Sequence, residues 1–483
     1  MEKKDLQPKV VFDCFAEVNR IPRPSKHEDL MMEFLVKFAQ DLGLEYKTDE
    51  TGNVVIKKPA TKGYEDRPTI VLQSHMDMVC EKNADVEFDF KKDPIQTYID
   101  GEWLKAKGTT LGADDGIGVA MEMAVLKSND IEHGPIECVF TRDEETGLGG
   151  AIGMKSDFMN GDYLINLDSE DEGEIFVSCA GGANTVAEFP FDVTPIPAGY
   201  YTCKVMVKGL MGGHSGDDIN KNRANANKQL VRFLCQELKK TDLRLVDIQT
   251  GGLHNAIPRE GYAIVAVPND FKDEMRADLN IFGEALKEEF SETEKNIQVL
   301  LETEENAKEA QEPAQAQRQL STFLAVFNGV FAMSQTIPGF FVETSSNLAS
   351  IHRVGNKVDV VTSQRSSIMS NRKHVSAVVR AAFELGGATK IVTGDGYPGW
   401  NTDPNSPLVQ KAVETYKQLF KKEPIVRGIH AGLECGLFSE KYPHMDMVSV
   451  GPTMRGVHSP DERLLIPTVQ MVWDHLLALL KAI

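Results

Sequence analysis

Two adjacent carboxylic acids, Glu144 and Glu145, come shortly after an apolar run at 138–140 that predicts a buried strand. In open α/β sheets, ligands bind outside the carboxyl ends of the strands. Neighbouring residues at a strand end point to opposite sides, so one acid can bind a metal ion while the other acts on a water molecule. A solvated acidic turn is the ordinary alternative for an isolated Glu-Glu pair. The choice between the two therefore depends on other residues of the chain.

Further residues of metal-ligating type lie at the ends of other predicted strands and at the start of a predicted helix. The strand expected over 69–73 leads to His75, and the strand expected over 163–167 leads to Asp168. A glycine-containing loop with Asp114 opens the next predicted helix. Such a layout is typical of a site built across one edge of a sheet.

The types of these residues favour particular metals. In His75-Met76-Asp77, the spacing lets His75 bind a metal ion while Asp77 accepts the other ring N–H and fixes the orientation of the imidazole. A hydrogen-bonded histidine at a strand end is the ordinary alternative. Four more residues would complete two metal positions if the first of them bridges: Asp114, Glu145, Asp168 and His458. Imidazole and carboxylate ligands without a thiolate suit zinc in an open catalytic site, with cobalt or manganese as alternatives.

Together, in this order and at these strand ends, the residues resemble the di-zinc metallopeptidase family of aminoacylases, glutamate carboxypeptidases and cytosolic dipeptidases. The family pattern extends from Ser74 to His458, which is essentially the whole chain. Four segments resemble the dipeptidase branch in particular: Leu111-Gly112-Ala113-Asp114-Asp115-Gly116, Tyr397-Pro398-Gly399-Trp400, Ile429-His430-Ala431-Gly432-Leu433-Glu434-Cys435-Gly436 and Gly456-Val457-His458-Ser459-Pro460. Many family members have Met-Lys-Gly after the bridging aspartate, so Asp115 remains a rival to Asp114 for that role.

The resemblance implies two divalent metal ions with one shared ligand. The ligands would be His75, Asp114 and Asp168 for one ion, and Asp114, Glu145 and His458 for the other. Two cations lower the pKa of a bridging water toward about 7 and polarise the scissile carbonyl. Glu144 would be free to take the proton of that water and pass it to the departing amine. Asp77 would orient His75.

The resemblance also assigns substrate contacts to the middle of the chain. His214, in Gly212-Gly213-His214-Ser215-Gly216, resembles a lid histidine that reaches over the site to the oxyanion; an exposed turn is the alternative. Asn255 and Arg365 match positions that hold the carbonyl and the terminal carboxylate of the substrate. Arginine pairs with carboxylates in a bidentate manner, although a surface arginine is the ordinary alternative. Gly432 would offer its backbone to the substrate.

The predicted fold class is α/β. We expect a catalytic domain with a mostly parallel sheet between helices, formed by 1–190 and 390–483, and an inserted α+β lid domain over 191–389. The sequence leaves open whether the lid has two similar halves. Within it, the polar stretch 302–319 indicates a connector or an exposed helix, and 320–333 a further helix. Near the N-terminus, Ser25 and Glu28 have the spacing of a capping box.

Composition and net charge indicate which partners and which cellular location to expect. The chain has 483 residues and a formal net charge of −20, which argues against a nucleic-acid partner. Its seven cysteines form no C-x-x-C pair, as is usual for reduced thiols in the cytoplasm. No apolar stretch indicates a signal peptide or a membrane span. We therefore expect an unexported, cytoplasmic protein.

The expected function is metal-dependent hydrolysis of unblocked dipeptides, Xaa-His dipeptides included. An aminoacylase or a tripeptidase of the same family is the nearest alternative, because lid contacts rather than metal ligands set substrate choice. A non-catalytic binding protein is the alternative from another class. Every ligand position is filled, however, and buried carboxylates are costly to keep without a cation. The sequence leaves open whether two chains pair as a homodimer.

Overall fold

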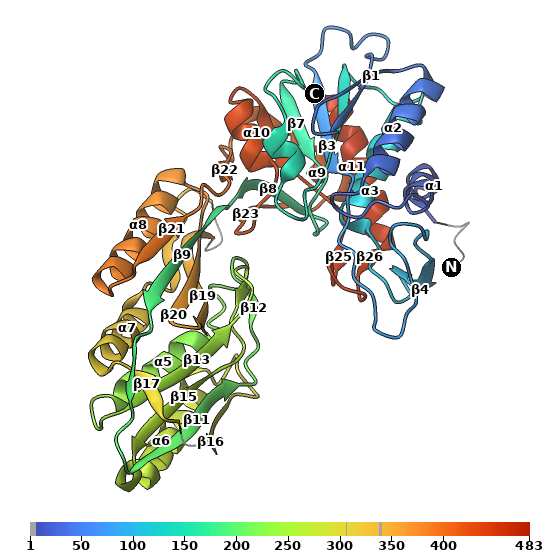
Figure 1. The fold of residues 1–483 in the computed structure, drawn as a ribbon. Helices are drawn as coiled ribbons and strands as arrows, with labels where there is room; N and C mark the ends of the chain where they lie inside the picture. Colours follow the sequence, from blue (N-terminus) through green and yellow to red (C-terminus); the bar gives the residue numbers. More distant parts are fainter. Residues whose placement is uncertain (1–5, 306, 338–340) are drawn as a thin grey trace.

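The computed structural model describes residues 6–305, 307–337 and 341–483, and it has two lobes (Figure 1). The first lobe contains the blue N-terminal elements and the red C-terminal helix, whereas the green to orange middle of the chain forms the second. Each lobe is built around a nine-stranded sheet. Among the described helices, none is long and apolar enough to cross a membrane.

The sheet of the first lobe has four parallel central strands in the order β6-β3-β7-β24. Every residue of β3 and β6 is buried, which explains their near-continuous apolar sequence. The central strands are β3 (Ile70–His75), β6 (Ile136–Thr141), β7 (Tyr163–Asn166) and β24 (Asp446–Ser449). The outer strands are β1 (Glu45–Thr48), β2 (Val54–Lys58), β8 (Glu174–Cys179), β22 (Trp400–Asn401) and β23 (Ile425–Ile429). The predicted α/β class is thereby confirmed.

Helices cover both faces of this sheet. Ile70 and Leu72 of β3 pack in a core with α1, α2, α3, α9 and α11, whereas Val71 packs on the other face with α4 and α10. The helices are α1 (Lys9–Val18), α2 (Asp29–Leu42), α3 (Ala113–Lys127), α4 (Gly149–Gly153), α9 (Pro407–Phe420), α10 (Cys435–Lys441) and α11 (Ile466–Ala482). A small antiparallel sheet is formed by β4 (Thr97–Asp100), β5 (Trp103–Ala106), β25 (Met454–Arg455) and β26 (Arg463–Leu465).

The sheet of the second lobe is antiparallel, in the order β16-β11-β15-β13-β19-β20-β9-β21. Apart from β18 (Gly329–Met333), which pairs with β19, it consists of two βαββαβ halves that meet where β13 pairs with β19. The first half contains β11 (Tyr200–Lys208), α5 (Ala226–Glu237), β13 (Arg244–Gly251), β15 (Gly261–Pro268), α6 (Lys272–Glu289) and β16 (Gln298–Thr303). The second contains β9 (Gly181–Pro190), α7 (Pro313–Ala325), β19 (Val342–Val354), β20 (Lys357–Ser366), α8 (Met369–Leu385) and β21 (Lys390–Thr393). Both halves arrange their four strands in the order fourth, first, third, second, so the lid does have two similar halves.

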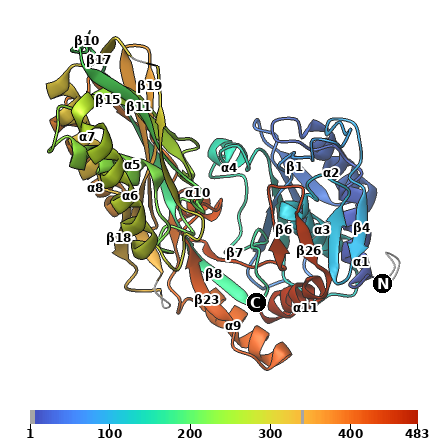
Figure 2. The same cartoon turned by 90° about the horizontal axis from the view of Figure 1, so that it is seen from below.

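The first half of the lid is nested inside the second. The chain leaves β9, passes through β10, builds the first half and returns through β17, which pairs with β10, before it enters α7. The bounds of the short strands are β10 (Val193–Pro195), β17 (Glu309–Gln311), β12 (Gly213–His214), β14 (Ala256–Ile257) and β18 (Gly329–Met333). Helices α5 to α8 lie on the face of the sheet that points away from the first lobe (Figure 2). The opposite face is turned toward the first lobe.

Some local predictions differ from the structure. Of the two alternatives for 302–319, the helix is present from Pro313, which starts α7 at its first turn. It is not an exposed helix, however, because Ala316 is buried in the lid core. The predicted helix over 320–333 is wrong beyond residue 325, where the chain continues into β18. The capping box is also absent: α2 starts without a side-chain cap, and the Ser25 hydroxyl bonds to a residue outside the helix.

The division at residues 190 and 390 remains a prediction. Strand β9 (181–190) and strand β21 (390–393) both pair within the lid sheet. If the domains were divided by sheet membership, the first border would therefore lie between β8 and β9, and the second between β21 and β22.

Candidate metal centre

Three neighbouring parallel strands deliver ligand-type side chains to one edge of the first sheet. Strand β3 ends at His75, Glu145 follows β6, and Asp168 follows β7. These strands lie side by side in the order β6-β3-β7, and all three run in the same direction. The structure therefore brings the three residues together, as expected for a site at the carboxyl ends of parallel strands.

Glu144 and Glu145 lie in a turn beyond β6, not on the strand itself. The prediction that strand alternation separates their side chains is therefore wrong. Their directions are instead set by Asp77, whose two carboxylate oxygens accept the backbone N–H groups of Glu144 at 3.0 Å and of Glu145 at 3.2 Å.

His75 is fully buried and is oriented by its neighbours. Its Nδ1 lies 3.3 Å from Oδ1 of Asp77, which also accepts the Ser25 hydroxyl at 2.8 Å on its other oxygen. Its Nε2 is directed to the opposite side, 3.1 Å from Asp114 and 3.6 Å from Asp168. One ring nitrogen thus faces the orienting carboxylate and the other faces the ligand-type oxygens.

Asp114 lies between the two histidines. Its Oδ1 is 3.1 Å from Nε2 of His75, and its Oδ2 is 3.1 Å from Nε2 of His458. His458 also lies 3.0 Å from Oε2 of Glu145. Asp115, joined to Asp114 by a cis peptide bond, accepts the backbone N–H of Gly118 at 3.1 Å within α3. One oxygen of its carboxylate is therefore engaged by the helix, whereas the other is buried without a hydrogen-bond partner. The carboxylate of Asp114 has one oxygen toward each histidine.

The donor set fits divalent metal ions. His75, Asp114 and Glu145 offer ligand atoms that all lie within 4.8 Å of one another, and so do His75, Asp115 and Asp168. Oε1 of Glu145 is buried without a hydrogen-bond partner. Among the described residues, no Lys or Arg forms an ion pair with these carboxylates. A bound cation would compensate for the burial of so many acids.

The electrostatics of the acids agree with this interpretation. Burial raises the pKa of Asp168 to about 7 and raises the pKa of Glu145, with the charge of Asp114 acting in the same direction on both. The pKa of Glu144 is well above its usual range because of burial and because Asp168 and Glu145 are close, although His75 opposes the shift. Burial also opposes ionisation of Asp114, yet hydrogen bonds from His458 and His75 outweigh it and lower its pKa.

Three buried charged residues around the centre were not predicted from the sequence. Arg23 donates to the backbone carbonyls of Asp77 at 2.8 Å and Gly112 at 2.6 Å. Glu434 accepts hydrogen bonds from side chains at the ends of β3 and β6, and Glu462 accepts backbone N–H groups at the start of α3. An isolated arginine gives no sequence signal. Glu434 lies in a segment that carries the family resemblance, and Glu462 comes two residues after another such segment. Only that proximity could have drawn attention to them.

The predicted substrate residues of the lid form a second group. Pairing of β12 with β14 brings His214 beside Asn255, whose backbone carbonyl accepts the N–H of Ser215 at 2.8 Å. The guanidinium of Arg365, on β20, lies 3.3 Å from Nε2 of His214 and donates to the hydroxyl of Tyr397 at 3.1 Å. The Asn255 side chain is exposed, whereas Arg365 is buried and its Nε has no partner.

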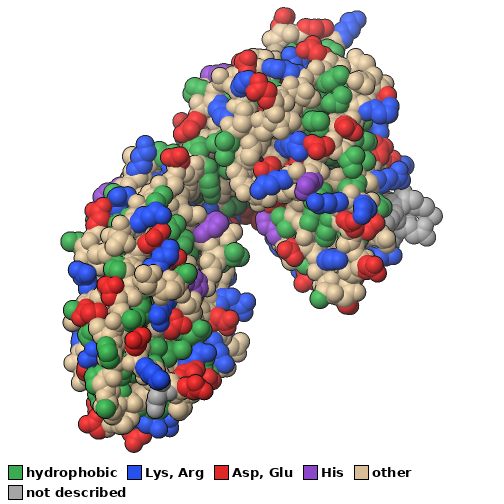
Figure 3. Space-filling model, viewed as in Figure 1, with side chains coloured by type: hydrophobic (Ala, Val, Ile, Leu, Met, Phe, Trp, Pro, Cys, Tyr) green, Lys and Arg blue, Asp and Glu red, His purple; other side chains and the backbone are tan. Residues whose placement is uncertain are grey.

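Gly432 lies in the segment between β23 and α10, next to this lid group. A Cβ at this position would be 2.8 Å from the Tyr397 ring, so a side chain larger than glycine's does not fit there. Among the described residues, no hydrogen bond or ion pair connects the lid group with the metal-ligand residues. A space-filling view shows a deep hollow between the lobes with histidine side chains on both walls (Figure 3).

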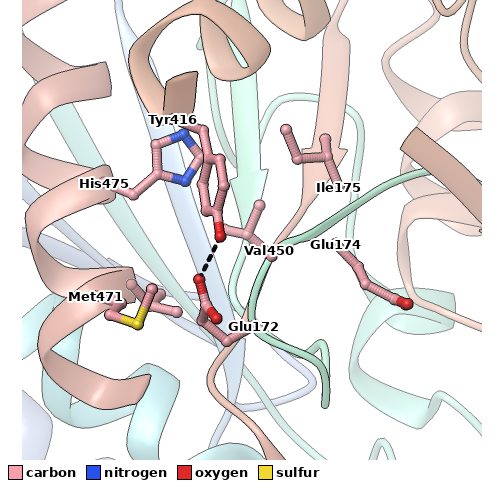
Figure 4. A pocket seen from close by; sticks show the side chains of 10 residues that line it. Glu172, Glu174, Ile175, Tyr416, Val450, Met471 and His475 are labelled. Carbon is pink, nitrogen blue, oxygen red and sulfur yellow. Dashed lines mark hydrogen bonds between the residues drawn. The ribbon is translucent and has the colours of Figure 1, made fainter. Parts of the chain in front are cut away.

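A small cavity elsewhere carries no part of this site. Its volume is about 10 Å³, enough for about one water molecule, and it lies beside α9 and α11. There the hydroxyl of Tyr416 donates to Glu172 at 2.7 Å, close to the ring of His475 (Figure 4). None of the candidate ligands lines it.

Known proteins resemble the chain over its full length. It is 45% identical over 482 residues to the cytosol non-specific dipeptidase of Escherichia coli (strain K12), and the match covers 100% of this chain and 99% of that protein. The crystal structure of aminoacylhistidine dipeptidase from Vibrio alginolyticus matches with a TM-score of 0.89 and 45% identity, covering 100% of this chain and 98% of that one. A tripeptidase of Staphylococcus aureus shares the fold, with a TM-score of 0.60 at 17% identity over 99% and 98% of the two chains.

The sequence pattern shared by a whole peptidase family also matches the chain, in agreement with the single relatives. The pattern of peptidase family M20/M25/M40 matches residues 71–482, which include every candidate ligand from His75 to His458. The family resemblance stated from the motifs is confirmed by this match and by the full-length relatives. The chain therefore belongs to peptidase family M20/M25/M40.

Proposed function

We propose that this protein is a cytosolic dipeptidase that uses two divalent metal ions, zinc in the first place, to hydrolyse unblocked dipeptides of broad sequence, Xaa-His dipeptides among them. The names of its full-length relatives, a cytosol non-specific dipeptidase and an aminoacylhistidine dipeptidase, support the substrate class. The observation that carries the proposal is the position of Asp114, with one carboxylate oxygen toward each histidine and Glu145 beside the second.

In this proposal each ion has three protein ligands and shares Asp114. The ligand sets are His75, Asp114 and Asp168 for one ion, and Asp114, Glu145 and His458 for the other. When bound, the ions supply an activated water and polarise the scissile carbonyl. Asp77 keeps Nε2 of His75 free for a ligand role, because it faces the Nδ1 side of the ring.

Glu144 is the proposed general base. It lies in the same loop as Glu145, but its carboxylate takes part in none of the contacts that join the ligand residues. A general base accepts a proton and later releases it, and Glu144 is a buried carboxylate close to the ligand acids Glu145 and Asp168. Glu144 would take a proton from the attacking water and release it to the amine that leaves.

The lid group is proposed to bind the substrate. Arg365 carries an unpartnered Nε and can form a bidentate pair with the terminal carboxylate of a dipeptide. His214 would donate to the oxyanion, Asn255 would hold the substrate carbonyl, and Gly432 would present its backbone. Since His214, Asn255 and Arg365 lie on the other lobe from the ligands, the lobes must close on the substrate before reaction.

A substrate panel tests the proposed function. We expect the zinc-loaded protein to hydrolyse Ala-His and other free dipeptides with a kcat/KM at least about tenfold above that for a tripeptide or an N-acetyl amino acid, because a tenfold preference requires only about 1.4 kcal/mol of differential binding. Release of free amino acids would be measured for each compound. Faster turnover of the N-acetyl compound would indicate an aminoacylase, and faster turnover of the tripeptide a tripeptidase. Less than one tightly bound metal ion per chain, with no turnover, would favour a binding protein.

The two lid residues are expected to affect different kinetic constants. Arg365→Ala should raise KM strongly with a smaller change in kcat, because a carboxylate clamp already acts in the ground state. His214→Ala should lower kcat by about 10²- to 10³-fold, the usual loss when one oxyanion donor is removed. Steady-state kinetics on one good dipeptide would measure both constants.

Two controls accompany these variants. His352, an imidazole on β19 that pairs with Gln249 within the lid sheet, can be replaced by alanine as a match for His214. Both lid variants should bind two metal ions like the wild type, since neither residue is a proposed ligand. Wild-type constants for both variants would refute the lid assignment, whereas metal loss would show that the residue supports the metal centre instead.

A further inference from the structure

Four consecutive backbone N–H groups donate to one buried carboxylate, that of Glu462. Its Oε2 accepts from Leu111 at 2.6 Å and Gly112 at 2.9 Å. Its Oε1 accepts from Ala113 at 2.7 Å and Asp114 at 3.3 Å. A carboxylate has about four lone-pair sites, so these four donors use its full capacity. Glu462 is therefore no metal ligand, although it lies beside the metal centre.

The four donors belong to the loop that carries the bridging Asp114. They precede or begin α3, where backbone N–H groups lack partners within the helix. Charge-assisted bonds from such groups to a carboxylate are among the stronger hydrogen bonds of proteins. Arg23 holds the same loop from its other side through the carbonyl of Gly112. Gly112 has a φ of +67°, and a Cβ there would be 2.6 Å from the Arg23 guanidinium, so the loop fits between the two charges only with glycine.

The backbone of Glu462 belongs to the turn that carries His458. Its N–H donates to the carbonyl of Ser459 at 3.0 Å, and the Ser459 hydroxyl donates to Gly456 at 2.7 Å. His458 itself lies in the left-handed region with a φ of +61°. One residue thus joins the loop of Asp114 to the turn of His458, two ligand segments that are far apart in the sequence.

The two histidines of the centre differ in how they are held. His75 is 1% exposed, follows a central strand and has Asp77 at its Nδ1. The side chain of His458 is 52% exposed, and its polar contacts among the described residues are Asp114 and Glu145. The position of His458 therefore depends on its backbone turn, while that of His75 depends on the sheet.

We propose that Glu462 is a positioning residue that couples Asp114 to His458 and thereby sets the affinity of the metal ion held by Asp114, Glu145 and His458. The other ion, held by His75 and Asp168 besides Asp114, depends on Glu462 much less, because its remaining ligands are fixed by β3 and β7. The inference rests on the ligand sets of the proposed function.

Glu462→Gln tests the coupling. The amide keeps the shape of the side chain but replaces one acceptor oxygen by a donor that would face the loop N–H groups. Calorimetric titration of the metal-free protein with Zn²⁺ should show one binding step weakened by about 10- to 100-fold, the usual loss when an outer partner of a metal site is removed. The other step should keep its wild-type affinity. Excess Zn²⁺ should restore most of the activity, which it would not do if the fold were damaged.

Two variants identify the step and control for charge. His458→Ala removes a proposed ligand and should abolish the same step that Glu462→Gln weakens. Asp461→Asn makes the same change of charge one residue earlier, at an exposed side chain outside the contacts of Glu462, and should leave both steps unchanged. If the wild type binds fewer than two ions, or His458→Ala binds two normally, the ligand sets fail, whatever Glu462 does.

The coupling itself is overturned by a different result. Suppose that the wild type binds two ions and that His458→Ala loses one step, as expected. The coupling is then refuted if Glu462→Gln binds both ions with wild-type affinity, or if it weakens both binding steps equally. If Glu462→Gln does not fold, Glu462→Asp replaces it. The shorter carboxylate keeps the charge but reaches fewer of the four N–H groups, so it must weaken the same single step. A lower melting temperature with two unchanged steps would limit Glu462 to a role in stability.

Discussion

Replacement of Glu144 by glutamine is expected to lower kcat by about 10²- to 10⁴-fold, the contribution that a general base usually makes. The variant should still bind two metal ions, since the Glu144 side chain takes part in none of the contacts between the ligand residues. KM should change little, because the amide has nearly the same shape as the acid. Steady-state kinetics and metal analysis of the same preparation would measure these quantities.

Asp143→Asn is the matched control for Glu144→Gln. It changes the charge one residue earlier, and an asparagine oxygen can still accept the hydrogen bond that the Thr146 hydroxyl donates to this side chain. The control should retain nearly full activity. Normal kcat in Glu144→Gln with both ions bound would exclude Glu144 as the base. Glu434, a buried acid that also acts on the pKa of Glu144 and is no proposed ligand, would be tested next.

Replacement of Asp114 by asparagine is expected to remove both metal ions at ordinary concentrations and to lower activity by about 10³-fold or more. The proposal makes this carboxylate the shared ligand, and metal ions contribute several kcal/mol to such reactions, with each 1.4 kcal/mol equal to about tenfold in rate. The neutral amide cannot place a negative oxygen toward each histidine. Metal content after dialysis and residual dipeptidase activity would be compared with the wild type.

Asp115→Asn distinguishes the two adjacent aspartates. Asp115 caps the backbone N–H of Gly118, which an asparagine oxygen can also accept, so this variant should retain both ions and most of its activity. The reverse pattern, with metal lost in Asp115→Asn and kept in Asp114→Asn, would transfer the bridging role to Asp115. That outcome has a geometric basis, because Asp115 also lies within ligand distance of His75 and Asp168.

The positions of His75, Glu145 and Asp168 could be predicted because each follows a strongly apolar strand. A parallel sheet aligns the carboxyl ends of such strands, so the sequence order of strand and acid is enough to bring them together. The family assignment was also available from motifs alone. The turn that carries Glu144 and Glu145 was not, because the chain can take many paths over the three or four residues after a strand, and here Asp77 selects one of them.

Arg23 and Glu462 were beyond sequence reasoning for a different reason. Each is an ordinary charged residue in a loop, and its burial results from tertiary contacts with backbone groups far away in the chain. Local pattern carries no information about such contacts. The burial of α7 was equally hard to predict, because its sequence is mostly polar and only a few apolar residues pack on the lid core.

The nested lid also has a consequence for protein synthesis. The first half is contiguous over 200–303 and can fold as soon as it leaves the ribosome, whereas β9 must wait for β20 at 357–366 before it gains its partner. Until then the nascent chain carries an unpaired strand that is open to pairing with other chains. Pairing of β9 with β20 closes a long loop, which costs conformational entropy. That entropy cost is lowered once the first half has folded, because pairing of β10 with β17 brings the ends of the insertion together. The inner half would thus act as a scaffold for completing the outer one.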